Sequence, residues 1–215
     1  MKERLLNAKK ENEMSWLLFC CALVIVVLII AIVNNKILMR VQVFGPSMNN
    51  TLYGGEMSAD GDYVGGDILL AVRNIRPERG EIVVISGKKP GALIIKRVIG
   101  VGGDQIKITE SGEVYRNGVL LDESSYAIGK TEGSTVTGEW SETERAYLYS
   151  VPEGQYFYLG DNRENSMDSR SAYGYCSGNQ IVGVVPGWSV SVKGIVTFFT
   201  EAFLPVANFV QGLFS

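Results

Sequence analysis

The stretch Phe44-Gly45-Pro46-Ser47-Met48-Asn49-Asn50-Thr51-Leu52 frames one serine tightly, a few residues beyond a long apolar segment. Gly45 permits φ > 0 or a close backbone approach, and Pro46 fixes φ just before the hydroxyl. Ser47 is therefore predicted to sit on a stiff, sharply shaped turn that suits a nucleophile. Gly-Pro-Ser alone more often marks a plain turn, so the rest of the chain has to decide between the two.

A serine nucleophile needs a group that removes its proton, and the 215 residues include no histidine. A Ser-His-Asp triad is thereby excluded, which leaves a lysine kept neutral by burial or an N-terminal amine. The N-terminus lies on the other side of the apolar segment. Residues 91–101, GALIIKRVIGV, contain Lys96 after four apolar residues and are typical of a buried or half-buried strand.

Alternation along that strand places Lys96 and Arg97 on opposite faces, so one of the two cations must point inward. Burial lowers the pKa of a lysine, and the free amine can then act as a general base. The alternative is a Lys96 side chain that extends to solvent at a strand edge.

Residues 160–170, GDNRENSMDSR, are dense in turn formers and hydrogen-bonding side chains and predict a loop. Their carboxylates suggest an EF-hand calcium loop. However, Arg163 occupies its third position and no glycine stands at its sixth, so no metal is expected.

With these pieces in view, the chain resembles the type I signal peptidases of the bacterial Ser-Lys kind. Four boxes match in family order: 45–52 resembles Gly-x-Ser-Met-x-Pro-Thr-Leu, 79–84 resembles Arg-Gly-Asp-Ile-Val-Val, 96–100 is Lys-Arg-Val-Ile-Gly, and 160–170 resembles Gly-Asp-Asn-Arg-x-x-Ser-x-Asp-Ser-Arg. Each match is weak alone, but four matches in family order make coincidence very unlikely, and together with the apolar segment they span nearly the whole length of the chain.

Three positions depart from the family pattern. Asn50 stands where the family has proline and Glu81 where it has aspartate, and both lie outside the Ser-Lys pair. Gly45 occupies a position where some relatives carry a serine whose hydroxyl helps the oxyanion hole. No side chain of this chain can do so there.

The resemblance implies a membrane-bound serine endopeptidase that removes N-terminal signal peptides from exported preproteins. Ser47 would be the nucleophile and Lys96 the general base. The Ser47 backbone N–H, with help near Gly45, would stabilise the oxyanion. No metal or organic cofactor is expected.

The resemblance also implies supporting roles in the loop at 160–170. Ser166 would orient the lysine amine through a hydrogen bond, Asp168 and Arg170 would brace the loop as an ion pair, and Asp161 would be structural. The preprotein would bind as an extended strand, with small residues before the cut in shallow apolar pockets.

Residues 15–33 form a run of 19 residues without a charge, about 28 Å long as a helix, which is enough to span a hydrocarbon core. Four basic residues precede the run in 1–14, whereas only Lys36 and Arg40 follow it closely. The positive-inside rule then predicts a cytoplasmic tail at 1–14 and a cell-membrane protein whose residues from 34 onward lie outside the cytoplasm. A cleavable signal peptide is the alternative, but 34–36 offers no small-x-small site.

Residues 34–193 are rich in glycine and in short β-branched runs, and they predict a mostly β, antiparallel catalytic domain. The predicted strands are 40–44, 67–72, 81–86, 93–101, 105–109, 113–116, 147–151, 156–159 and 181–185. Asn117-Gly118 marks a hairpin turn. The polar stretch 122–150 matches no box and is predicted to be an accessory insertion, a subdomain or a mobile excursion.

The C-terminal run 194–215 is apolar and aromatic, interrupted by Glu201 and Pro205. Because a carboxylate is unfavourable in a lipid core, we expect this run to lie on the membrane surface, with a second crossing as the alternative. Cys176 is the one cysteine beyond the apolar run, so no disulfide is expected in the outer domain. The net charge of −3 is too small to imply a nucleic-acid partner.

Two other classes of function remain open. One is a different Ser-Lys protease, such as a self-cleaving repressor, although the apolar span and the lack of DNA-binding helices argue against it. The other is a non-enzymatic membrane-anchored β-domain in which the boxes are only structural.

Overall fold

The computed structural model describes residues 2–32, 36–89 and 91–212, with side chains for 14–29, 36–89 and 91–202. The chain divides into two units, Met1–Met39 and Arg40–Ser215. Helix α1 (Lys2–Ile32) makes up most of the first unit. Within the described ranges, no helix is long and apolar enough to cross a membrane. The span predicted at 15–33 also includes Val33, which lies outside the described residues.

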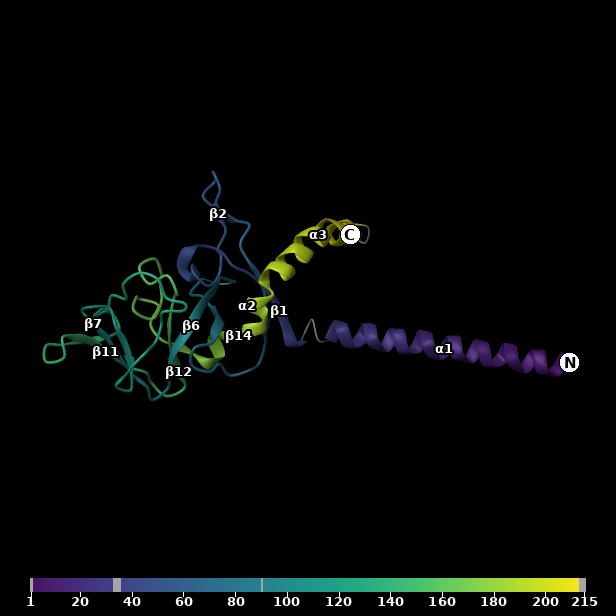
Figure 1. Ribbon diagram of the computed structural model, residues 1–215, viewed down its shortest axis with the longest axis horizontal. Coiled ribbons are helices and arrows are strands. Elements are labelled where there is room, and N and C mark those ends of the chain that lie inside the picture. The colour runs from purple at the N-terminus through teal and green to yellow at the C-terminus, as the bar shows by residue number, and fades with distance from the viewer. Residues whose placement is uncertain (1, 33–35, 90, 213–215) are drawn as a thin grey trace. The chain divides into compact units, whose positions relative to one another are not determined.

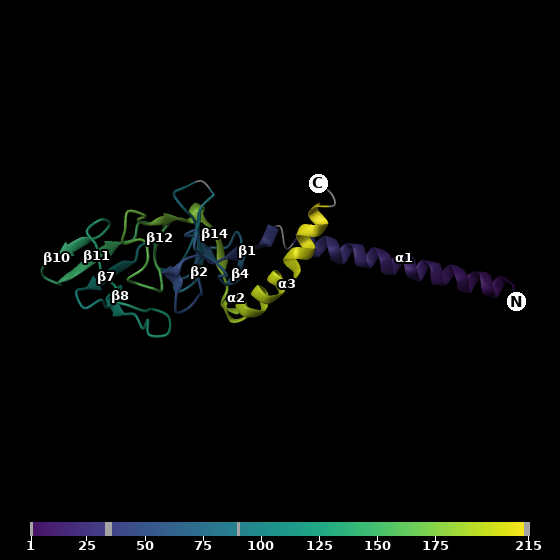
Figure 2. The same cartoon turned by 90° about the horizontal axis from the view of Figure 1, so that it is seen from above.

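Two antiparallel sheets form the body of the second unit, and Figures 1 and 2 show them toward opposite ends of it. The seven-stranded sheet has the order β1 (Leu38–Gln42), β4 (Ile68–Val72), β14 (Ile181–Val185), β5 (Ile82–Ser86), β6 (Leu93–Val101), β12 (Gln155–Leu159), β13 (Cys176–Ser177). The five-stranded sheet has the order β10 (Glu139–Ser141), β11 (Ala146–Ser150), β7 (Gln105–Thr109), β8 (Val114–Arg116), β9 (Val119–Leu120).

The hydrophobic core is divided between the two faces of the β6–β12 pair. Val98 and Tyr158 are register partners and pack into one buried cluster. Ile99 and Phe157 pack into a second cluster together with Ile106 of the five-stranded sheet. Because side chains alternate along a strand, β6 contributes to both clusters, and Lys96 lies on the face that carries Val98.

The mostly β, antiparallel fold predicted from the sequence is confirmed. All nine predicted strands are present, and their ends differ from the prediction by at most two residues. The hairpin at Asn117-Gly118 is also present, with φ of 52° and 80° at its two central residues. The strands that were not predicted, β2 (Glu56–Met57), β3 (Tyr63–Val64), β10 and β13, have only two or three residues, too few for an alternating pattern to appear.

Two stretches without a matching box have defined structure. Residues 122–150, predicted as an accessory insertion or subdomain, contribute β10 and β11 to the same sheet as β7. The C-terminal stretch forms α2 (Gly187–Ser191) and α3 (Lys193–Gly212). Helix α3 is attached at its first turns, because Lys193 pairs with Asp67 at 2.7 Å and Thr197 Oγ1 accepts a hydrogen bond from the Ile68 N–H.

Candidate active site

Ser47 lies in a single turn of 3-10 helix, η2 (Pro46–Met48), that is held at both ends. Gly45 precedes it with a φ of 81°, a conformation that glycine adopts without a steric penalty. Met48 is fully buried and anchors the other end in the core. The Ser47 N–H donates no hydrogen bond to any described residue. It is therefore available to a bound substrate.

Gly45 packs directly against the backbone of Gly54. The Gly45 N–H donates to the Gly54 carbonyl oxygen at 2.9 Å, and a Cβ on Gly54 would lie 1.7 Å from the Gly45 carbonyl oxygen. The expectation that Gly45 helps to bind the oxyanion is not supported, because its N–H already has an acceptor. Gly45 instead shapes the turn that presents Ser47.

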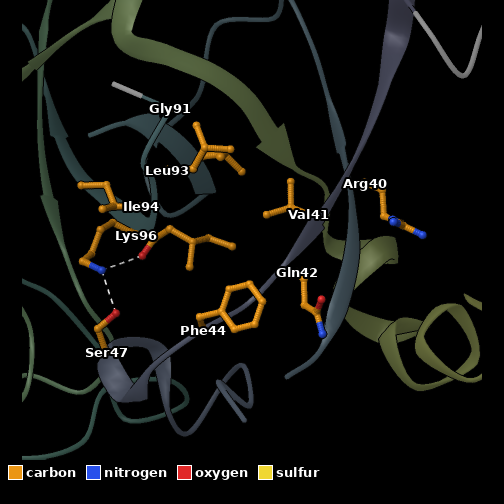
Figure 3. Close-up of a pocket in the computed structure, with 11 residues that line it drawn as sticks. Arg40, Val41, Gln42, Phe44, Ser47, Gly91, Leu93, Ile94 and Lys96 are labelled. Atoms are coloured by element: carbon orange, nitrogen blue, oxygen red, sulfur yellow. Dashed lines mark hydrogen bonds between the residues drawn. The ribbon is translucent and has the colours of Figure 1, made fainter. Parts of the chain in front are cut away.

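Lys96 lies within β6, between β5 and β12, and is only 4% exposed. Its Nζ lies 2.7 Å from Ser47 Oγ and 2.8 Å from the Ile95 carbonyl oxygen (Figure 3). Burial lowers the pKa of Lys96 from 10.5 to about 8, although Asp168 and Asp161 act to raise it. Lys96 therefore does not extend to solvent at a strand edge but contacts the serine as a desolvated amine.

A cavity of about 470 Å³ opens beside this pair. Its walls are mostly apolar and come from β1 and the residues after it, from β5, and from the start of β6. The lining residues are Arg40, Val41, Gln42, Phe44, Ser47, Val84, Gly91, Leu93, Ile94, Ile95 and Lys96. Figure 3 shows Val41, Phe44 and Leu93 on different sides of the space next to Ser47.

Asp161 connects the strand of Lys96 to the turn of Ser47. The carboxylate is fully buried and accepts two hydrogen bonds from Arg97, from Nε at 2.8 Å and from Nη2 at 2.6 Å. It also accepts a hydrogen bond from Thr51 Oγ1 at 2.5 Å. Arg97 directly follows Lys96, and Thr51 lies four residues after Ser47.

The ion pair expected between Asp168 and Arg170 is present and buried. Arg170 Nε and Nη2 each donate to a carboxylate oxygen of Asp168 at 2.8 Å, and the Gly160 N–H donates to the same carboxylate at 3.0 Å. Both aspartates of the loop thus face guanidinium groups. No described side chains form a group of three or more metal-binding residues.

Ser166 has no hydrogen bond to Lys96. Its Oγ is buried and has no hydrogen-bond partner among the described residues. It nevertheless lies close to the nucleophile, because Ser166 Oγ and the Ser47 carbonyl oxygen are 2.2 and 2.5 Å from the point that a Cβ on Gly160 would occupy. Only glycine at position 160 allows both groups to approach.

Comparison with known proteins identifies the family of this site. The family model described as signal peptidase, peptidase S26, matches residues 14–188. The chain belongs to the signal peptidase family, peptidase S26. It is accordingly a serine endopeptidase, and the resemblance indicated by the four sequence boxes is confirmed.

Several relatives of this signal peptidase come from Bacillus. Signal peptidase I of Bacillus amyloliquefaciens is 35% identical over 148 residues, 66% of this chain and 68% of the relative. Signal peptidase I T of Bacillus subtilis (strain 168) is 32% identical over 183 residues, 82% of this chain and 86% of the relative. The crystal structure of a signal peptidase I from Enterococcus faecalis V583 is 30% identical and covers 52% of this chain and 98% of its own, with a TM-score of 0.38.

The structure of this signal peptidase also places at the site residues that the sequence reasoning missed. Arg97 and Thr51 hold Asp161, and Asn162 donates its N–H to the Ser47 carbonyl oxygen at 3.0 Å. All three lie inside the matched boxes, so their position in the sequence could have indicated that they belong to the site. Glu123 and Tyr126, which contact Arg163 and Arg97, lie in the stretch without a box, and nothing in their local sequence indicated a role.

Proposed function

We propose that this chain removes signal peptides from exported preproteins with Ser47 as the nucleophile and Lys96 as the general base. The observation that carries this proposal is the 2.7 Å distance between Lys96 Nζ and Ser47 Oγ at an amine that burial desolvates. No histidine exists to take the proton. A lysine can do so only as a free amine, which a lowered pKa makes accessible near neutral pH.

The reaction follows from these two side chains. Ser47 Oγ attacks the scissile carbonyl carbon while its proton passes to Lys96 Nζ. The resulting oxyanion accepts a hydrogen bond from the free Ser47 N–H. Lys96 then returns the proton to the departing amine as the peptide C–N bond breaks, which leaves an acyl ester on Ser47. Water, deprotonated by Lys96, attacks this ester, and the proton finally returns to Ser47 as the ester C–O bond breaks.

Supporting roles fall to the loop at 160–170. Asp161 holds the turn of Ser47 against the strand of Lys96, and the Asp168–Arg170 pair fixes the loop. Ser166 Oγ has no hydrogen-bond partner in the part of the chain that the structure describes and lies close to Ser47, so we assign it as the acceptor that orients the Lys96 ammonium once Ser47 has lost its proton.

The substrate proposed for this site is an extended peptide with small residues before the cut. Strand β1 is the edge of the seven-stranded sheet and lines the cavity beside Ser47. A peptide can therefore add to it as a further strand, while alternate side chains enter the apolar cavity. Crowding against Phe44 and Leu93, rather than the loss of a contact, would exclude bulky residues at the position next to the scissile bond.

We further propose that residues 15–33 anchor the chain in the cell membrane, with 1–14 in the cytoplasm, the catalytic domain at 34–193 outside and 194–215 on the membrane surface. The support is in the sequence: the uncharged run of 19 residues, the basic tail before it, and the apolar C-terminal stretch that Glu201 interrupts.

The test is incubation of the purified full-length chain, in detergent, with a preprotein, and mass analysis of the products. The parent should cut once, directly after a small residue at the end of the signal peptide. Ser47→Ala should abolish both this cut and labelling by a serine-directed acylating inhibitor, whereas Ser150→Ala, on the far sheet, should change neither. Activity that survives Ser47→Ala would refute the dyad, and a fully active cut at unrelated sites would favour a different Ser-Lys protease.

A further inference from the structure

Residues 122–131, here called the strap, cross the loop that carries Asp161 and Asp168. The Ile128 N–H donates to the Asp161 carbonyl oxygen, and the Arg163 N–H donates back to the Ile128 carbonyl oxygen, both at 2.9 Å. These two bonds form a parallel bridge between Ile128 and Asn162. The strap thus makes one short strand-like contact with the loop, at residues 161–163.

A buried ion pair fastens the strap to the loop. Arg163 Nη1 and Nη2 donate to the two carboxylate oxygens of Glu123 at 2.8 and 2.6 Å. The Arg163 side chain is 0% exposed and that of Glu123 is 12% exposed. Bidentate arginine–carboxylate pairs are geometrically specific, so this contact fixes the strap as well as attaching it.

Tyr126 contacts three parts of the chain, namely strand β6, the strap itself and the segment just after Ser47. Its ring stacks against the Arg97 guanidinium, 4.2 Å from Arg97 Cζ to the ring centroid. Its hydroxyl, whose pKa burial raises, stays protonated and donates to Glu123 Oε1 at 2.9 Å. Its carbonyl oxygen accepts a hydrogen bond from Asn50 Nδ2, in the segment just after Ser47.

We propose that the ring of Tyr126 is a positioning element of the peptidase that keeps the Arg97 guanidinium paired with Asp161 and thereby sets the charge that faces Lys96. This inference rests on the proposed Ser47–Lys96 mechanism. Tyr126 does not line the substrate cavity, and its closest contact between the ring and a cation is with Arg97, so the ring is proposed to act on the site through Arg97.

The consequence for Lys96 has a definite sign. The charged groups that act on Lys96 are Asp168 and Asp161, while β5 presents Val83 opposite it and η2 presents Ser47. Arg170 pairs with Asp168, and Arg97 pairs with Asp161. If Arg97 moves away from Asp161, that carboxylate acts on Lys96 without a counter-charge. The ammonium form is then favoured, and less of the free amine is present at neutral pH.

Arg97 also donates from Nη1 to the Gly80 carbonyl oxygen at 2.8 Å, so loss of the ring loosens the guanidinium but does not release it. Given the strength of a contact between a cation and an aromatic ring, we expect loss of this stacking on Arg97 to raise the pKa of Lys96 by about half to one pH unit. In Tyr126→Leu the rising limb of kcat/KM should therefore move to higher pH by about that much. This corresponds to a loss of about 3- to 10-fold at pH 7, and the loss should disappear above the limb.

The experiment measures kcat/KM from pH 6 to pH 10 for the parent, Tyr126→Leu and Tyr126→Phe, with the full-length chain in detergent and a preprotein as substrate. Tyr126→Phe keeps the ring and should keep the parent's limb. Tyr115→Leu is the matched control, because it removes a ring that stacks on Lys107 in the far sheet, and its limb should not move. Tyr126→Met, whose unbranched and flexible side chain adapts to the vacated space, carries the same prediction if Tyr126→Leu does not fold.

Action through Arg97 predicts non-additivity. Arg97→Gln should move the limb in the same direction, and adding Tyr126→Leu should move it little further. A loss of activity in Tyr126→Leu that is equal at every pH would make the residue merely structural and overturn the proposal, as would an unchanged profile. Failure of the dyad itself would appear separately, as full activity of Lys96→Arg in an otherwise parental chain.

Discussion

At pH 7 an amine with a pKa of about 8 is protonated in about nine molecules of ten, so the neutral Lys96 that the mechanism requires is a minority species. We expect kcat/KM to rise with pH through a limb near 8, well below lysine's usual 10.5. Lys96→Arg should fold yet lose most activity at every pH, because a guanidinium does not deprotonate in this range. The measurement is a pH–rate profile of both proteins beside their melting curves. A folded and active Lys96→Arg would remove Lys96 from the mechanism.

The same burial makes Lys96 unfavourable for stability. Its pKa is lower folded than unfolded, so between about 8 and 10.5 the unfolded chain binds more protons, and stability rises with pH through this window. Below pH 8 the folded state retains the full penalty, about 3 kcal/mol for a difference of about 2.5 pH units. Lys96→Met, which removes the buried charge and keeps an unbranched chain, should gain about 1–3 kcal/mol at pH 7.

Urea denaturation at pH 7 and at pH 10.5 measures this gain. The gain should be large at the lower pH and shrink at the higher one, where the parent's amine is neutral in the folded state and about half neutral in the unfolded state. Lys107→Met is the matched control, because Lys107 pairs with Glu144 at the surface of the far sheet. An equal gain from both substitutions, or a gain that does not depend on pH, would contradict the account.

The turn that carries Ser47 depends on glycine at the base of the β2–β3 hairpin. A Cβ on Gly54 would lie 1.7 Å from the Gly45 carbonyl oxygen, and one on Gly66 would lie 1.9 Å from that of Val43. These are backbone atoms, so no side-chain rotation can relieve the contact. Gly54→Ala should therefore displace the turn, reduce stability by about 1–3 kcal/mol or more, and reduce kcat/KM sharply.

Gly187→Ala is the control for Gly54→Ala, because nothing lies within 4 Å of a Cβ at that position. Stability from urea denaturation and kcat/KM for both variants decide the matter. If the two behaved alike, the close approach of Gly54 to Gly45 would not matter for the turn.

Elements with their own pattern could be predicted from the sequence, and elements that depend on a distant partner could not. Strand β6 is a nine-residue run rich in apolar and β-branched residues, and its predicted bounds are those observed. Strands β2 and β13 have two residues each and exist because of the strands beside them. The strap has no periodicity, and its defining contact joins Glu123 to Arg163, forty residues away.

The same contrast applies within the site. Ser47 and Lys96 could be paired from sequence because the absence of histidine left few bases and because the boxes matched a family. The structure has no hydrogen bond between Ser166 and Lys96 among the described residues, and the Gly45 N–H already has an acceptor. Both features are decided by side-chain rotation and by backbone displacements of a few tenths of an ångström. Motif order carries no information at that scale.

For the whole molecule, the distribution of Lys and Arg on the two sides of the apolar run is the sequence feature that bears on the orientation of the chain in the membrane. The tail before residue 15 has four basic residues, and the two that follow the apolar run closely are Lys36 and Arg40. A preprotein presents its cleavage site where it emerges from the membrane, so a peptidase that acts on it needs its dyad on that side. Both considerations give the proposed orientation, with 1–14 inside and 34 onward outside.

This orientation predicts the outcome of protease protection. In right-side-out vesicles, added protease should reach the domain from residue 34 onward, while an epitope tag placed at the N-terminus stays intact. Inside-out vesicles should give the reverse result, and detergent should expose both segments. Adding basic residues between 34 and 40 while neutralising Lys9 and Lys10 should weaken or invert the preference, because orientation follows the Lys and Arg bias on the two sides of the span. A tag that is digested while the domain is protected in right-side-out vesicles would show that the orientation is the opposite one and would place Ser47 on the side from which preproteins depart.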